Sequence, residues 1–488
     1  MKSHTNKYLL KGKILFKKNY ITIAILFFFF AGYLILSINK HLNFLSGYDL
    51  SIIDQAIWKY SHFKNPVTTT HVYYDAAIYT DHLELIFVLI APLYRLFDSA
   101  ITLIVLQVIS VIGSGAAVFL IAGKFGLKKF VANSVLFSYL IFFGIQFAIW
   151  SDVHSLVFAI GFMAWFYYFL ISKKLKLMLL FLTMSLLCKE DIALLTLLIS
   201  MSQFIYTKSR TSILAMVISL LYLLVVFTVY FPILMGGYKY ANPQGIFSDT
   251  NPMYMVNTVD KRNALLYSLG SFGFLPVFAP FFLIPFLGDL AHYFVLGNAI
   301  VTSAHGIFAH YRSSVSLLLI IPTIIAISKV KKNNNKFAGL YLIACALFFQ
   351  YYLHLPLSYL AKSWFWKGSP EKISINTVIN ELPKNASIVT HNNIASHIAH
   401  RENIYTLFPY LKDFKKNSPC GAHTCKWFRV GGNPELLLID TGTSWNILHY
   451  LSQREEFLEA ISNLKKNGNI TLIKKIGTTE LYKITKKI

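Results

Sequence analysis

Acidic residues are scarce in this sequence, and charged residues of either sign are few. Only 14% of the 488 residues are charged, and Asp and Glu number 22 against 45 Lys and Arg. Hydrophobic residues make up 55% of the chain, and the mean hydropathy is +0.53. Because soluble domains carry roughly 25% charged residues, this composition excludes an ordinary soluble fold. It predicts an integral membrane protein.

Features of several other classes are also missing. No small-residue cleavage site follows the apolar segment after the Lys-rich N-terminus, so we expect the first helix to stay as an anchor. The chain has no internal repeat. The formal charge of +23 would suggest nucleic acid in a soluble protein. Here, however, Lys and Arg lie in short gaps between apolar segments, where they set orientation and meet lipid headgroups. We therefore expect a lipid bilayer and no nucleic acid as partner.

Apolar segments recur along the first 355 residues, and a helix of about 20 such residues spans the hydrocarbon core of a bilayer. Helices satisfy their own backbone polar groups there, so the sequence predicts an all-α polytopic membrane domain. We place about eleven transmembrane helices at 20–38, 100–122, 130–149, 155–171, 176–188, 191–206, 212–232, 263–275, 277–287, 313–328 and 337–355.

The apolar stretch 83–97 is interpreted as an interfacial or re-entrant element, because a crossing there would turn every later basic loop outward. With this choice the cytoplasmic segments hold eighteen Lys and Arg and no acidic residue. All twelve acidic residues before position 356 then lie on the other side. The asymmetry predicts a multi-pass protein of the plasma or inner membrane, with a cytoplasmic N-terminus.

Residues 356–488 are more polar and are predicted to form a small soluble α/β domain on the extracytoplasmic side, after a transmembrane domain at 1–355. Strand-like segments begin at Ser387, Glu435 and Ile470. Amphipathic helical stretches cover 393–401 and 454–466. Strands that alternate with helices are typical of α/β domains.

The four cysteines fall into two groups. Cys188 and Cys345 lie in apolar helices, where Cys behaves as a small hydrophobic residue. Cys420 and Cys425 belong to the sequence CGAHTC in the predicted outer domain. A disulfide in an oxidising compartment and a zinc site with His423 are both open readings, although zinc would need further ligands.

Two carboxylates mark the first outer loop, in the sequence GYDLSIIDQAIW. One reading makes Asp49 the N-cap of a short amphipathic helix on the membrane surface, with Asp54 facing water. In the other reading, Asp49 or Asp54 acts as a general base, or as an anion paired with a metal or substrate.

Two further outer segments combine His with acids. TDHLE contains His82 and Glu84, and WSDVHS contains Asp152 and His154. These side chains are suited to a divalent metal ion or to a phosphate-bearing substrate. The alternative is that they are solvated polar residues at helix ends.

Three ionisable residues, Lys189, Glu190 and Asp191, interrupt the apolar run 175–205. Charges at membrane depth are costly and commonly line functional cavities. A mutually neutralised structural corner is the other reading.

A basic and aromatic group, His310, Tyr311 and Arg312, precedes the next-to-last predicted helix. Arg grips phosphate with two parallel hydrogen bonds. Tyr and Arg also serve as plain headgroup anchors at the interface.

The sequence resembles an uncharacterised prokaryotic membrane-protein family, grouped as domain of unknown function twenty seventy-nine. The resemblance extends over most of the chain and is carried by YDLSIIDQAIW from Tyr48, DHLELIFVLIAPLYRLF from Asp81, SDVHS from Ser151, CKEDIALL from Cys188, HYRSS from His310, PKNASIV from Pro383, SHIAHRENIY from Ser396 and LLLID from Leu436.

That family is similar in layout to the GT-C superfamily of membrane glycosyltransferases, which use sugars carried on polyprenyl phosphates. The resemblance implies a catalytic carboxylate in the first outer loop, at Asp49 or Asp54, acting as base or metal partner. It also implies basic residues for the lipid phosphate, a role that Lys189 and Arg312 fit.

We therefore expect a GT-C-like enzyme that moves a sugar from a polyprenyl-phosphate donor to a glycan, lipid or protein acceptor. A divalent metal ion is the one cofactor considered. The alternatives are a transporter or flippase of lipid-linked intermediates and a non-enzymatic receptor or assembly factor. Acids gathered at one face favour surface chemistry over transport.

Overall fold

The computed structural model describes residues 2–70, 76–236, 256–296, 308–330, 335–367, 371–407, 432–442 and 454–486. The chain divides into two compact units. The first contains Met1–Leu36, Val105–Trp150 and Ser155–Leu360. The second contains Ser37–Ile104, Ser151–His154 and Ala361–Ile488. Residues from the predicted first loop thus belong to the same unit as the C-terminal residues.

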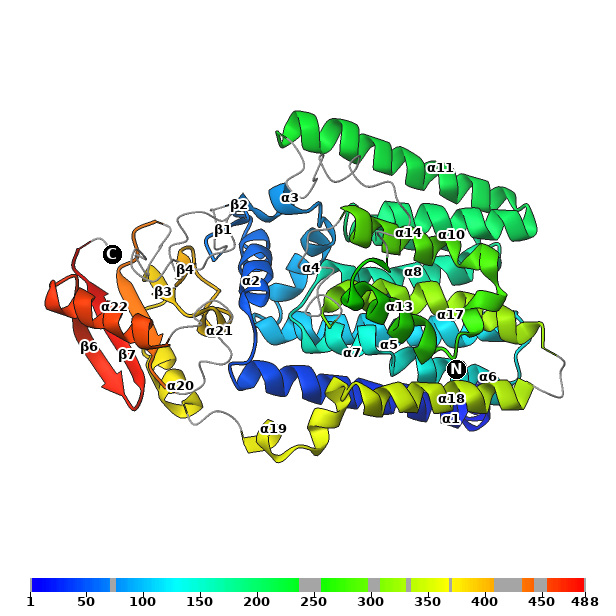
Figure 1. Ribbon diagram of the computed structural model, residues 1–488, viewed down its shortest axis with the longest axis horizontal. Coiled ribbons are helices and arrows are strands. Elements are labelled where there is room, and N and C mark those ends of the chain that lie inside the picture. The colour runs from blue at the N-terminus through cyan, green and yellow to red at the C-terminus, as the bar shows by residue number, and fades with distance from the viewer. Residues whose placement is uncertain are drawn as a thin grey trace. The chain divides into compact units, whose positions relative to one another are not determined.

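The first unit is helical, and its helices run side by side (Figure 1). Each of the eleven predicted apolar segments contains helix. The elements are α1 (Lys2–Leu42), α5 (Ala100–Lys124), α6 (Lys129–Leu140), α7 (Phe143–Trp150), α8 (Ser155–Ile171), α9 (Leu175–Leu186), α10 (Ile192–Thr207), α11 (Arg210–Val225), η1 (Val226–Leu234), α13 (Val259–Ser271), η3 (Leu275–Phe278), η4 (Pro280–Phe282), α14 (Ile284–Ala291), η5 (His292–Leu296), η6 (His310–Arg312), α17 (Ser313–Ser328), α18 (Asn335–Tyr352) and η7 (Pro356–Ala361).

Four helical segments of the described chain are long and apolar enough to cross a membrane: Asn19–Leu42, Ala100–Lys124, Arg210–Leu234 and His310–Ser328. The pair α6 and α7 makes a fifth if it is one span, although it is bent by 44°. Helices α8, α9 and α10 are apolar but shorter. The chain is thus a mostly helical membrane protein, and the total of about eleven spans stays a prediction.

Helix α17 forms the centre of the first unit. Every residue from Ser313 to Ile327 is buried, and the helix contacts α6, α7, α8 and α14. An all-round apolar sequence suits such a position, because no face meets water. The buried helix thereby fixes the position of Arg312, the residue just before it.

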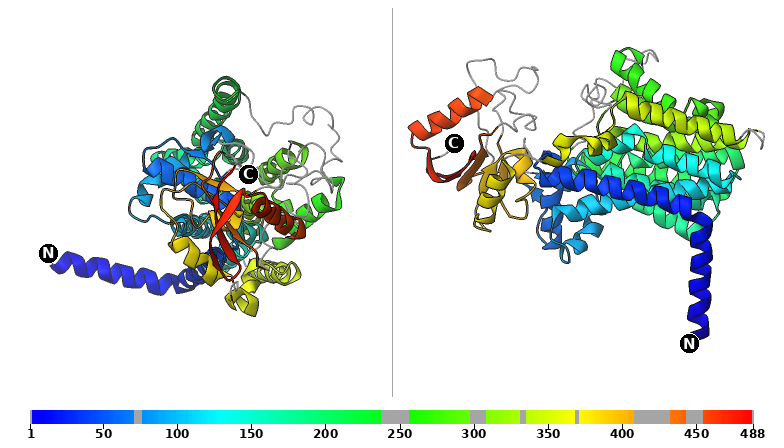
Figure 2. Two further views of the ribbon diagram at one scale, coloured as in Figure 1. Left: turned by 90° about the vertical axis from the view of Figure 1, so that its left-hand side faces the viewer. Right: turned by 90° about the horizontal axis from the view of Figure 1, so that it is seen from below.

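Helix α1 has a bend (Figure 2). The bend lies at Asn19, whose φ of −130° is not helical. After the bend, α1 packs on α6. Thr22 Oγ1 donates a hydrogen bond of 2.8 Å to Asn133 Oδ1, and the Tyr33 hydroxyl donates to the Leu140 carbonyl. The apolar part of α1 is therefore fastened to the bundle by buried polar contacts.

The second unit combines short helices with a small sheet. Its elements are α2 (Tyr48–Ser61), β1 (Val67–Thr68), β2 (Ala76–Ala77), α3 (Ile78–Asp81), α4 (Ile86–Tyr94), α19 (Ser363–Lys367), α20 (Lys372–Asn380), β3 (Ile388–Thr390), α21 (Asn392–Ala395), β4 (Ile404–Thr406), β5 (Leu436–Asp440), α22 (Arg454–Lys466), β6 (Ile470–Ile476) and β7 (Thr479–Ile484). Helix α4, within the stretch 83–97, has nine residues. It is too short to span a bilayer, which needs about 20.

The five-stranded sheet has the order β4-β3-β5-β7-β6. Strands β4, β3 and β5 are parallel, and β7 and β6 add an antiparallel hairpin. The three predicted strands correspond to β3, β5 and β6, whereas β4 and β7 were not predicted. The amphipathic helix expected at 393–401 is shorter, because α21 ends at Ala395.

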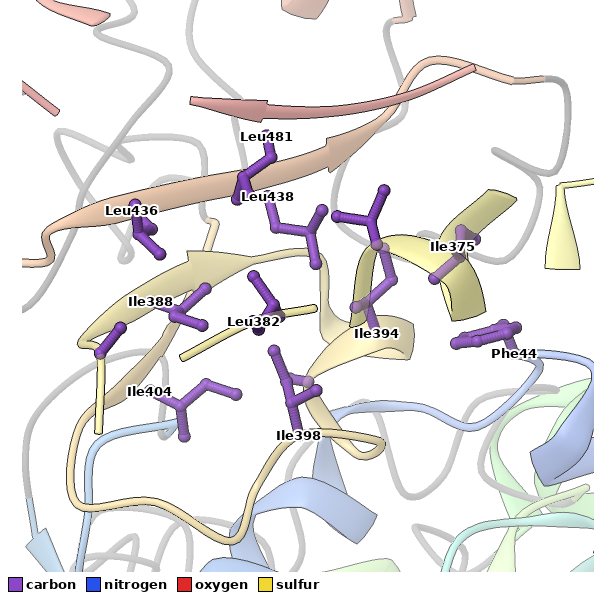
Figure 3. Packing of buried hydrophobic residues seen from close by; sticks show 13 residues of the cluster. Phe44, Ile375, Leu382, Ile388, Ile394, Ile398, Ile404, Leu436, Leu438 and Leu481 are labelled. Atoms are coloured by element: carbon purple, nitrogen blue, oxygen red, sulfur yellow. The ribbon is translucent and has the colours of Figure 1, made fainter. Parts of the chain in front are cut away.

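Two apolar clusters cover the two faces of this sheet. Ile388, Ile404 and Leu436 stand side by side in register and pack with helices α20 and α21 in one cluster (Figure 3). Phe44, from the segment after α1, joins the same cluster. The opposite face packs on α22 through Phe457. The sheet core is therefore completed by a residue more than 300 positions away from most of it.

The described cysteines agree with the expected apolar placement: Cys188 is buried and Cys345 is partly buried. Cys420, His423 and Cys425 lie outside the described residues. The disulfide and the zinc site stay predictions.

Candidate functional site

The N-terminus of α2 is held by a carboxylate from a distant segment. Asp152 Oδ1 accepts hydrogen bonds of 3.0 Å from the backbone nitrogen of Gly47 and from Lys40 Nζ. Asp152 Oδ2 accepts one of 3.2 Å from the Leu50 nitrogen. Burial raises the pKa of Asp152, but Lys40 and the Gly47 N–H outweigh it and hold the pKa below its ordinary value. Asp152 is therefore an ionised helix cap.

This arrangement corrects one of the two readings of Asp49. The N-cap of α2 is Gly47, which has no side-chain cap, and Asp49 lies in the first helical turn. A Cβ on Gly47 would lie 2.8 Å from Asp152 Oδ2. The cap position therefore belongs to glycine because the incoming carboxylate occupies the space of a side chain.

Asp49 is the accessible acid of this group. Its side chain is 39% exposed, and its Oδ2 lies 3.7 Å from His154 Nε2. That separation is longer than a hydrogen bond. The structure thus brings Asp49, Asp152 and His154 together, with one carboxylate bound by the helix end and the other turned partly to solvent. A carboxylate in this setting can accept a proton.

Asp54 is in a different environment. Its side chain is 1% exposed, so the reading in which Asp54 faces water is wrong. Asp54 Oδ1 accepts a hydrogen bond of 2.6 Å from the Tyr94 hydroxyl and lies 3.0 Å from His400 Nε2. The other ring nitrogen of His400 lies 2.7 Å from Asp98 Oδ1. Asp54 is therefore enclosed by partners.

His400 carries a charge because it lies between these two carboxylates. Burial lowers its pKa, yet Asp54 and Asp98 outweigh burial and raise the pKa to about 10. The hydrogen bond from His400 in turn lowers the pKa of Asp98. Sequence reasoning missed Tyr94, Asp98 and His400 as members of this group. Two signals were available: His400 lies in the family-like sequence SHIAHRENIY, and Tyr94 lies in DHLELIFVLIAPLYRLF.

His82 and Glu84 lie in the same unit, at the junction of α3 and α4. His82 is the C-cap of α3, and the Glu84 nitrogen donates a hydrogen bond of 3.0 Å to its carbonyl. Both side chains are half-buried. Within the described ranges, no three His, Cys, Asp or Glu side chains gather in a way that could hold a metal ion. The divalent metal ion stays a prediction.

A second group of ionisable residues lies in the first unit, around Arg312. The Arg312 side chain is 1% exposed, and its Nη1 lies 3.7 Å from Asp289 Oδ2. The guanidinium carbon stands 4.7 Å from the centre of the Tyr293 ring and 5.6 Å from that of Phe294. A Cβ on Gly144 would lie 2.2 Å from the Arg312 carbonyl oxygen. Helix α7 therefore approaches the Arg312 backbone as closely as glycine allows.

Tyr293 links this arginine to the predicted charged triplet. Its hydroxyl lies 3.5 Å from Asp191 Oδ2, and the same oxygen lies 3.9 Å from Lys189 Nζ. Glu190 is fully buried. We call Lys189, Asp191, Asp289, Tyr293 and Arg312 the arginine cluster.

The rings of His310 and Tyr311 lie at the edge of the arginine cluster. Their centres are 4.1 Å apart, and the Tyr311 ring is 5.9 Å from that of Tyr293. The two sequence-predicted triplets, separated by more than 100 residues, are thus brought together. Sequence reasoning missed Asp289 and Tyr293, although an aspartate inside the apolar stretch 280–296 was a signal. The functional roles of all these residues stay predictions.

Comparison with solved structures assigns the architecture. ArnT from Cupriavidus metallidurans, solved bound to undecaprenyl phosphate, matches with a TM-score of 0.58 at 10% identity, covering 95% of this chain and 98% of that one. The oligosaccharyltransferase of Archaeoglobus fulgidus, in the apo form, matches with a TM-score of 0.41 at 13% identity, over 80% of this chain and 65% of that one. The match to ArnT shows that the two chains share a fold.

Residues 40–427 match the model of a predicted membrane protein family, DUF2079. The chain belongs to this family. No curated protein matches the sequence.

Proposed function

We propose that this protein is a membrane glycosyltransferase that moves a sugar from a polyprenyl-phosphate donor to an acceptor on the extracytoplasmic side of the inner membrane. One observation carries the proposal: two aspartates on one helix have opposite environments. Asp49 is 39% exposed beside His154, whereas Asp54 is 1% exposed and bonded to Tyr94 and His400. An accessible acid that a buried one helps to position is an arrangement suited to general-base catalysis.

Asp49 is the proposed base. Its carboxylate takes the proton of the acceptor hydroxyl as the hydroxyl oxygen bonds to the anomeric carbon of the sugar. The bond between that carbon and the phosphate oxygen breaks, and the electron pair leaves with polyprenyl phosphate. His154 orients the Asp49 carboxylate from 3.7 Å. Asp54 and Asp152 hold helix α2 in place.

The leaving phosphate needs positive charge, and we assign that role to Arg312 and Lys189. Three guanidinium nitrogens of Arg312 have no hydrogen-bond partner among the described residues. A buried guanidinium in that state has five N–H donors to offer. A phosphate group supplies matching oxygens. ArnT, which shares the fold, was solved with undecaprenyl phosphate bound, and this supports a lipid phosphate as ligand.

The decisive experiment is donor turnover by the purified protein, offered a panel of radiolabelled polyprenyl-phosphate sugars. Asp49→Asn should abolish turnover and leave donor binding intact. Asp54→Asn should lower the stability, because the charged His400 loses a buried partner. Glu402→Gln is the matched control, since this half-exposed acid of the same unit pairs with Lys64 at the surface.

Two outcomes would contradict the proposal. Full turnover by Asp49→Asn would remove the assigned base. If no donor is consumed but an intact lipid-linked sugar crosses proteoliposomes, the protein is a flippase, and the arginine cluster then belongs to a transport path.

A further inference from the structure

The guanidinium of Arg312 is buried in an unusual state. Its side chain is 1% exposed, and Nε, Nη1 and Nη2 all lack a hydrogen-bond partner among the described residues. Buried donors without acceptors keep their full desolvation penalty, so native proteins rarely leave them in this condition. The site therefore either tightens around Arg312 or takes an anion.

Asp289 carries the carboxylate that comes nearest to pairing with Arg312, but the two side chains stay too far apart for a hydrogen bond. Its Oδ2 is 3.7 Å from Arg312 Nη1, and this oxygen has no hydrogen-bond partner within the described ranges either. Its Oδ1 accepts a hydrogen bond of 3.0 Å from Ser314 Oγ. Ser314 lies on α17, two residues after Arg312. The serine therefore holds the carboxylate back from a closed pair with its neighbour.

The aromatic rings decide which part of the guanidinium is left for a ligand. Tyr293 and Phe294 stand within 4.7 and 5.6 Å of the guanidinium carbon and contact it through their rings. Ring contacts of this kind use the face of the guanidinium and leave its N–H edges directed elsewhere. Those edges bind two oxygens of a phosphate in parallel.

We propose that Asp289 is a displaceable counter-ion, which neutralises Arg312 in the absence of ligand and gives up the guanidinium when a phosphate monoester binds. The inference rests on the proposed function, because the product of the transfer is a polyprenyl phosphate. Ser314 is a positioning residue that keeps the Asp289–Arg312 pair open. The exchange then breaks a Coulombic contact but no hydrogen bond.

The arrangement has a kinetic consequence. A carboxylate that waits beside the guanidinium weakens phosphate binding, because like charges repel at close range. The same carboxylate speeds release of the phosphate product. Asp289 thus lowers the affinity for the phosphate and raises the rate at which the phosphate product leaves.

The test measures the dissociation constant of undecaprenyl phosphate on the full-length protein in nanodiscs. Asp289→Asn keeps the side-chain shape and can still accept from Ser314, but it removes the competing charge. We expect binding about tenfold tighter, a change of about 1.4 kcal/mol. Ser314→Ala frees Asp289 to close on Arg312, so binding should weaken severalfold. Arg312→Gln should abolish binding.

Matched controls change the same residue types outside the pair. Asp260→Asn alters an acid of α13. Ser316→Ala removes a buried hydroxyl of α17 that bonds to the Ser313 carbonyl. Both should leave the dissociation constant within about twofold.

A second readout separates a counter-ion from a structural acid. Asp289→Asn should lower the unfolding temperature without ligand, because Arg312 then has no partner. The rise in unfolding temperature at saturating undecaprenyl phosphate should be larger than in the native protein, since the stabilisation follows ligand affinity. If Asp289 were only a structural acid, Asp289→Asn would lower the unfolding temperature without ligand and leave the ligand-induced rise unchanged.

Two further ligands identify the group that is recognised. Inorganic phosphate should compete with undecaprenyl phosphate for binding, and Asp289→Asn should tighten the binding of both. Binding of undecaprenol, which has no phosphate, should be unchanged by Asp289→Asn.

The outcomes distinguish this inference from the function on which it rests. If Arg312→Gln binds undecaprenyl phosphate normally, the assigned phosphate site is wrong. If Arg312→Gln fails to bind but Asp289→Asn is unchanged or weaker, the counter-ion proposal alone is overturned. An equal response of undecaprenol to Asp289→Asn would overturn it as well.

Discussion

Asp152 accepts a hydrogen bond from the backbone nitrogen of Gly47, 105 residues earlier in the chain, at 3.0 Å. Helix N-termini leave N–H groups without partners, and a cap is normally supplied by a neighbouring side chain. Here Gly47 has none, and the carboxylate arrives from a separate segment. This distant carboxylate helps to orient helix α2, and with it Asp49.

Asp152→Ala should therefore destabilise the protein and misplace Asp49. The change breaks the buried ion pair between Lys40 and Asp152, and breaking such a pair costs about 3–5 kcal/mol. The check is the apparent unfolding temperature at a fixed scan rate. Asp152→Asn can still accept a hydrogen bond from Gly47, so its unfolding temperature should lie between those of the native protein and Asp152→Ala. An unchanged unfolding temperature for Asp152→Ala would show that the cap is dispensable.

Gly144→Ala should disturb the arginine cluster without touching a charged group. The new Cβ would meet the Arg312 carbonyl oxygen at 2.2 Å, so the backbone of α7 or of Arg312 must shift. Overpacking of this kind costs roughly 1–3 kcal/mol or more. We expect lower stability together with weaker binding of undecaprenyl phosphate. Gly123→Ala is the control, because nothing lies within 4 Å of its added Cβ.

His400 should make stability fall as the pH rises. Burial lowers its pKa but the carboxylates outweigh burial, so the folded-state pKa is about 10, above the ordinary value of about 6.5. A raised pKa contributes stability that is complete below about pH 6.5 and is lost as the pH approaches 10, in total on the order of 5 kcal/mol.

The measurement for His400 is the unfolding temperature between pH 6 and pH 10, compared with His400→Gln. The native protein should lose its advantage over the variant as the pH rises. A difference that is constant with pH would mean that His400 is not charged in the folded state.

His391 should make stability fall as the pH is lowered, the opposite of the effect of His400. Burial lowers its pKa to about 4, and its ring packs on Phe457 at 5.5 Å. The unfolded chain binds a proton more readily between about pH 6.5 and pH 4, so stability is complete above that window and falls with acidification. His391→Leu should weaken this acid sensitivity in thermal unfolding at pH 4.5 and pH 7. Equal sensitivity in the two proteins would argue against a neutral buried ring.

The sequence predicted the helical segments of the first unit well because a bilayer demands long apolar runs, which leave a plain record. Strand β6 was also predictable from its run of apolar and β-branched residues. Strand β4 was not, because three residues between a helix and a turn carry no periodicity. Its position depends on pairing with β3, a tertiary contact that no local pattern encodes.

The candidate site was predictable by residue type but not by environment. Asp49 and Asp54 are the same side chain on the same helix, and their different exposure comes from Tyr94 and His400, which lie 40 and 346 positions away from Asp54. In the same way, Arg312 was evident in the sequence, whereas its counter-ion Asp289 emerged only when α14 and α17 were brought together.

The second unit is closed by a hydrogen bond from Thr69 Oγ1 to the Ile404 carbonyl, across 335 residues. A ribosome adds roughly 5–20 residues per second, so Thr69 emerges about 17–67 seconds before its partner exists. Throughout that interval the segment that carries Asp49 cannot pack against strand β4, because that strand has not yet been made. Translation through β4 is therefore a prerequisite for this contact, and the segment that carries Asp49 reaches its final packing only after those residues have been made.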